Sequence, residues 1–63
     1  MYAEMSSVEA GIKFKSPSGA VVQTTGISQE IEANGVHVHE VEIIEGTGQG
    51  YKFLHNLDAS EAL

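Results

Sequence analysis

The sequence has no cysteine, no arginine and a single proline among 63 residues. The lack of cysteine excludes disulfide bonds and thiolate metal sites, which small secreted domains often use to compensate for a thin core. A chain of this length buries only about 60% of the surface that its unfolded form exposes. Stability must therefore come from packing within one small domain or from contacts with partners.

Positive charge is also scarce. Only Lys13, Lys15 and Lys52 oppose nine acidic residues, which gives a net charge of −6. The resulting negative field repels phosphate backbones and attracts basic surfaces. We therefore expect no direct binding to nucleic acid, and a basic protein as an outside partner.

Long apolar runs are missing as well. No stretch approaches the roughly 20 apolar residues that a membrane helix needs, and the first ten residues show no basic export signal. We expect no membrane association and a cytoplasmic location. The apolar fraction of 41% and the charged fraction of 19% are those of a folded protein. Residues 1–7 lack a clear period and predict a flexible N-terminus, which leaves residues 8–63 as one small domain.

Short alternating segments indicate β-strands. Apolar residues recur at every second position from Val8 to Phe14, and Ser16-Pro-Ser-Gly19 is typical of a turn into the β-branched segment Ala20–Thr25. Gly26 then predicts either a bulge or a sharp bend.

Asn34-Gly35 is the strongest turn signal, because this pair favours the two-residue type I′ turn of a tight hairpin. With that loop, Ile31 lies opposite Val38 on an apolar face of the sheet. Continuing the same register would place Glu40 on that apolar face, so the pattern predicts a one-residue β-bulge at His39-Glu40.

The remainder of the chain predicts a glycine-rich loop over residues 46–50, a last strand from Tyr51 to Leu54, and one helical turn over Asp58–Leu63 that docks Leu57 or Leu63. The glycines do not have the spacing of a dinucleotide-binding loop. The fold class is therefore all-β and mainly antiparallel: a small meander or SH3-like barrel of four or five strands with at most a short terminal helical turn.

Two histidines, His37 and His39, are the candidate metal ligands, because residues two apart on a strand present both imidazoles on one face. His55 or a glutamate is the candidate third ligand. The alternative is structural, since the predicted register places Glu32 opposite His37 and Glu30 opposite His39 as cross-strand charge pairs.

Catalytic residues do not stand out. No serine lies in a nucleophile elbow, and the abundant glutamates have the spacing of a solvated sheet face. We predict no cofactor, and an enzyme only if subunits build a site between them.

Two predicted strands each contain two adjacent apolar residues, which point to opposite faces of the sheet. A leucine in the last strand is likewise out of phase with its aromatic neighbours, so these side chains cannot all face one core. We expect an outward apolar patch of Val22, Ile44 and Leu54. The patch favours a homo-oligomer, most simply a dimer, unless a terminal segment folds over it.

The leading functional hypothesis is a non-enzymatic, acidic, self-associating protein-interaction module. The alternatives are an oligomeric ligand binder or enzyme with a site between subunits, and a histidine metal site.

Overall fold

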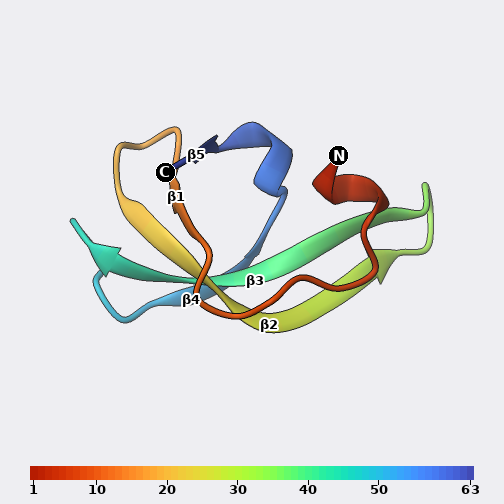
Figure 1. Ribbon diagram of the computed structural model, residues 1–63, viewed down its shortest axis with the longest axis horizontal. Helices are drawn as coiled ribbons and strands as arrows, with labels where there is room; N and C mark the ends of the chain where they lie inside the picture. Colours follow the sequence, from red (N-terminus) through yellow and green to blue (C-terminus); the bar gives the residue numbers. More distant parts are fainter.

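A computed structural model describes residues 1–63 and shows one curled, antiparallel, five-stranded sheet (Figure 1). The elements in chain order are η1 (Tyr2–Glu4), β1 (Lys13–Lys15), β2 (Val21–Ile31), β3 (Val36–Glu45), β4 (Lys52–His55), η2 (Leu57–Ala59) and β5 (Glu61–Ala62). The strand order is β4-β3-β2-β1-β5. The predicted all-β antiparallel class is confirmed, with a meander of β1 to β4 and only 3-10 turns in place of helices. No pairing joins β4 to β5, so the sheet is not closed by hydrogen bonds into a barrel.

The first strand is shorter than its sequence pattern predicts. β1 covers only Lys13–Lys15, because Gly11 has a φ of +88° and breaks the extended run that begins at Val8. Backbone bonds from Gly11 N to Thr24 O and from Thr24 N to Ile12 O still hold this segment beside β2. The turn predicted at Ser16–Gly19 is confirmed by a bond from Gly19 N to Ser16 O.

The β2–β3 hairpin has a longer loop than predicted. Residues 32–35 form a four-residue loop, and Ile31 pairs with Val36 rather than with Val38. Gly35 takes the left-handed conformation with φ +71°, but no residue other than glycine has positive φ, so the type I′ prediction is wrong. Asn34 instead accepts a bond from Val36 N through its Oδ1 at 3.0 Å.

The main register shift lies in β2, not at the predicted position His39-Glu40 of β3. Thr24 pairs with Val41 and Ser28 pairs with His39, so Thr25, Gly26 and Ile27 oppose a single residue of β3. Gly26 supplies the φ of +93° that this irregularity needs. The break expected at Gly26 is therefore present, and β3 runs past it without a bulge, which places His39 and Val41 on the same face.

The core is thin. Only six of 63 residues are buried, and four of these are apolar: Phe14, Val22, Val41 and Leu57. Thr24 and His39 are the buried polar residues. Val22, which the sequence places in the outward patch, is instead fully buried, because the register pairs it with Phe14 on β1 and Ile43 on β3.

The C-terminal segment forms a single turn, η2, that begins one residue earlier than predicted. Asn56 caps it, accepting a bond from Asp58 N at 3.1 Å, and Leu57 docks in the core. Leu63 remains exposed, and Glu61–Ala62 pairs with β1 rather than continuing the helix.

Candidate interaction surface

The end of the hairpin extends beyond its neighbouring strands. β1 pairs with β2 only as far as Gln23, and β4 pairs with β3 only as far as His39. The segment from Ile27 to Val38, which we call the distal hairpin, is therefore two-stranded and forms one end of the molecule in Figure 1. An isolated two-stranded ribbon is marginally stable in water. This end of the protein thus depends on contacts made by its two faces.

The inner face of the distal hairpin is the one covered by the chain itself. Ser28 pairs with His39 and Glu30 pairs with His37 on this side. His39 is fully buried beneath the N-terminal segment.

The outer face carries no charge. Because side chains alternate along a strand, the pairs Gln29–Val38 and Ile31–Val36 point away from His39. Together with Ile27 they form a surface that we call the hairpin face: Ile27, Gln29, Ile31, Val36 and Val38. Ile27 is 57% exposed and Ile31 is 40% exposed. Contiguous apolar residues of this kind on a small protein typically mark an interaction site.

Of the three predicted interface residues, only Leu54 lies at an exposed position of this side of the sheet. It pairs with Glu40, next to the hairpin face, and is 44% exposed. Ile44 is half-buried beside the register shift at Val21/Val22. Neither Ile27 nor Val36 was predicted as a surface candidate, although their apolar character beside polar neighbours was the available signal.

The charged residues of the distal hairpin are all acidic. This hairpin contains Glu30 and Glu32 and no lysine, since residues 16–51 contain none. Neither glutamate forms an ion pair. At the other end of the sheet, in contrast, β1 and β4 carry all three lysines, and Lys52 pairs in register with Glu42 and Lys15 with Glu61.

The two candidate metal ligands are in different environments. Ser28 Oγ lies 2.7 Å from His39 Nδ1, and Tyr2 O lies 3.0 Å from His39 Nε2. A carbonyl oxygen only accepts, so Nε2 carries the proton and Nδ1 accepts from the serine hydroxyl. His37 is half-buried, and the chain gathers no group of three potential ligands. Metal binding at His37 and His39 therefore stays a prediction from sequence, to which the structure adds no third ligand.

A contact between a histidine and a serine has the short distance of a catalytic nucleophile–base pair but none of its other features. His55 Nε2 lies 2.6 Å from Ser60 Oγ. Ser60 N donates to Leu57 O, so it is not free to stabilise an oxyanion, and no carboxylate bonds the other ring nitrogen of His55. The contact ties β4 to the residue that follows η2.

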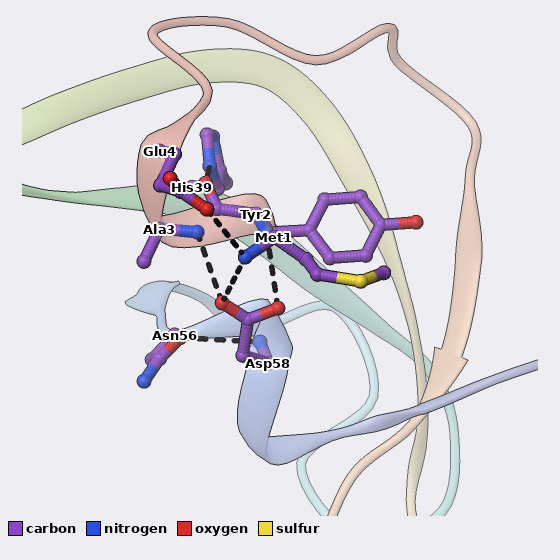
Figure 2. A network of polar contacts seen from close by, with 7 residues as sticks. All are labelled: Met1, Tyr2, Ala3, Glu4, His39, Asn56 and Asp58. Carbon is purple, nitrogen blue, oxygen red and sulfur yellow. Dashed lines mark hydrogen bonds and ion pairs between the residues drawn. The ribbon is translucent and has the colours of Figure 1, made fainter.

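The N-terminal segment is fastened at a polar cluster shown in Figure 2. The Asp58 carboxylate accepts bonds from Tyr2 N and Ala3 N, both at 3.0 Å, and the Met1 ammonium lies 3.6 Å away. These two backbone amides hold the pKa of the Asp58 carboxyl below its ordinary value. With the bond from His39 to Tyr2 O, the cluster joins η1 to both η2 and β3.

Burial alone lowers the pKa of His55 below its ordinary value of 6.5. The unfolded chain therefore binds more protons in the range just below that value, and stability should fall as the pH falls from 7 through the folded-state pKa. We expect the urea midpoint to decrease over this range, and His55→Gln to flatten the decrease. An unchanged slope in His55→Gln would assign the effect to another group.

The largest hollow on the surface has a volume of about 480 Å³ and is open to solvent. All its lining residues belong to the N-terminal segment: Tyr2, Met5, Ser7, Val8, Glu9 and Ile12. No histidine lines it, and Glu9 supplies its only carboxyl group, so it lacks the convergent polar groups of a catalytic pocket.

No helix in the structure has the length and apolar character needed to cross a bilayer. No protein-family model matches the sequence, and neither the curated proteins nor the solved structures yield a significant match.

Proposed function

We propose that this protein is a non-enzymatic, acidic protein-interaction module that self-associates through the hairpin face. The observation that carries the proposal is the uncharged, largely apolar hairpin face on a two-stranded end of the sheet, where Ile27 and Ile31 are exposed and Val36 and Val38 are half-buried. The cytoplasmic location expected from the sequence is part of the same proposal.

Stability supports a second copy as the occupant of this face. With only four buried apolar residues, the chain has little core from which to stabilise a two-stranded extension. A two-fold arrangement lets the same patch serve both subunits, so each apolar contact is made twice. Packing the hairpin faces together would also convert two exposed ribbons into two layers of a sandwich.

The distribution of charge also supports a second copy as the occupant of the hairpin face. The net charge of −6 opposes association between copies, so the contact surface should be where charge is absent. Glu30 lies on the opposite side of the ribbon from Ile31, and Gln29 is the only polar residue of the hairpin face. None of the five residues of the hairpin face is ionised, and Glu40, the nearest carboxyl group on the same side of the sheet, lies at its border beside Leu54.

Substituting Ile31→Ser should weaken self-association, because it removes apolar area from both sides of a two-fold contact. We expect the dimer dissociation constant to rise roughly tenfold or more, as measured by sedimentation equilibrium. Leu63→Ser is the matched control, since Leu63 is 66% exposed but lies outside the hairpin face.

A wild-type protein that stays monomeric across the micromolar range would contradict the proposal. An equal effect of Ile31→Ser and Leu63→Ser would show that general surface hydrophobicity, and not the hairpin face, drives association.

A further inference from the structure

The side of β2 that faces away from β3 makes no backbone hydrogen bonds beyond Thr24, although Ala10 still packs beside Gly26. The last backbone bonds on this side join Thr24 to Ile12 and Gly11. Beyond Thr24, the strand is paired only with β3. The irregularity around Gly26 interrupts the first part of this edge, which leaves the regular segment from Ser28 to Ile31 unpaired. An unpaired strand edge is a template for an added strand.

This edge lacks most of the devices that block strand addition. It contains no proline and no lysine, and nothing in the chain covers it with backbone hydrogen bonds. Its only charged side chain is Glu30, which is exposed and forms no ion pair. Glu32 follows in the loop with the same charge and the same lack of partner.

The negative charge of Glu30 determines which kind of strand can be added at this edge. A second copy added antiparallel about a two-fold axis would bring its own Glu30 close to this one, and like charges on neighbouring strands are destabilising. A strand that carries lysine or arginine would instead form cross-strand charge pairs. The absence of any lysine between residues 16 and 51 leaves that positive charge to be supplied by the partner.

We propose that the β2 edge from Ser28 to Ile31 binds an extended basic segment of another protein by strand addition. Backbone bonds supply the attachment, and basic side chains at alternate positions face Glu30. Strand addition uses the backbone edge while self-association uses the hairpin face, so the two contacts are compatible. This inference does not require the protein to be a dimer.

The test uses the full chain and a short peptide of alternating lysine and valine. Amide chemical shifts in a ¹H–¹⁵N titration should move mainly in Ser28–Ile31, and the affinity should fall as salt is added. A peptide of alternating glutamate and valine should not bind. Glu30→Lys should weaken binding of the basic peptide about fivefold, whereas Glu45→Lys, at the other end of the sheet, should have little effect.

Three outcomes would overturn the proposal: shifts centred elsewhere, equal binding of the acidic peptide, or shifts at this edge that depend on protein concentration without peptide and persist in Ile31→Ser, in which self-association through the hairpin face is weakened. The last outcome would assign the edge to a second copy. Because Ile31→Ser changes a side chain and leaves the backbone edge intact, that variant should bind the basic peptide like the wild type. This variant therefore distinguishes a failure of self-association through the hairpin face from a failure of peptide binding at the edge.

Discussion

Phe14→Ala should remove a large part of the free energy of unfolding. Phe14 is completely buried at the centre of β1, between Val22 on β2 and Ala62 on β5, and its ring meets Tyr2 edge-to-face with centroids 5.3 Å apart. Removing a buried phenylalanine costs about 3–5 kcal/mol. A domain of this size has a total stability of only about 3–9 kcal/mol, from roughly 0.05–0.15 kcal/mol per residue.

Urea denaturation followed by circular dichroism measures the loss. Tyr51→Ala is the control, because Tyr51 is exposed and its ring stacks on that of Phe53 at the surface of the sheet. The control should lower the unfolding free energy by less than about 1 kcal/mol. If both variants shift the midpoint equally, the core is not centred on Phe14.

The fold class could be predicted because its signals are local. The turn at Ser16–Gly19 and the break at Gly26 follow from the backbone preferences of proline and glycine, and strand segments follow from alternation. Each of these depends only on neighbours in sequence. All of them hold in the structure except the early start of β1, which Gly11 prevents.

Register could not be predicted, because it depends on the length of one loop. Asn34-Gly35 fits a two-residue turn, but Gly35 alone takes positive φ and Asn34 acts as a side-chain acceptor, so the loop has four residues. Ile31 then pairs with Val36 in place of Val38, and the bulge moves from His39-Glu40 to the β2 strand. His37 accordingly pairs with Glu30 and His39 with Ser28, whereas Glu32, the predicted partner of His37, lies in the loop.

The hairpin face escaped prediction for a related reason. Whether Ile27 and Ile31 are covered depends on how far β1 and β4 run beside the hairpin, and strand length is a tertiary property. The same holds for Tyr2, which lies in a segment without periodicity and yet contacts Phe14 and His39. Side chains that connect distant segments leave no local pattern.

His39→Leu should also destabilise the protein strongly, and it tests the role of the N-terminal segment. The buried imidazole donates to Tyr2 O and accepts from Ser28 Oγ. Leucine of similar size leaves Ser28 Oγ without this partner and removes one of the two bonds to Tyr2 O, which also accepts from Met5 N. Unsatisfied buried polar groups cost about 1–3 kcal/mol each. We expect a loss of about 2–3 kcal/mol in the free energy of unfolding.

The loss should be accompanied by faster hydrogen exchange at the Tyr2 and Ala3 amides, because the bond from His39 is one of the two polar attachments of η1. His37→Leu is the matched control on the same strand, since His37 makes no side-chain hydrogen bond. His39→Gln should recover part of the stability, because its amide supplies both a donor and an acceptor. If His39→Leu is as stable as the wild type, the N-terminal segment is held by Asp58 and the Tyr2–Phe14 contact alone, and the buried histidine is free for another role.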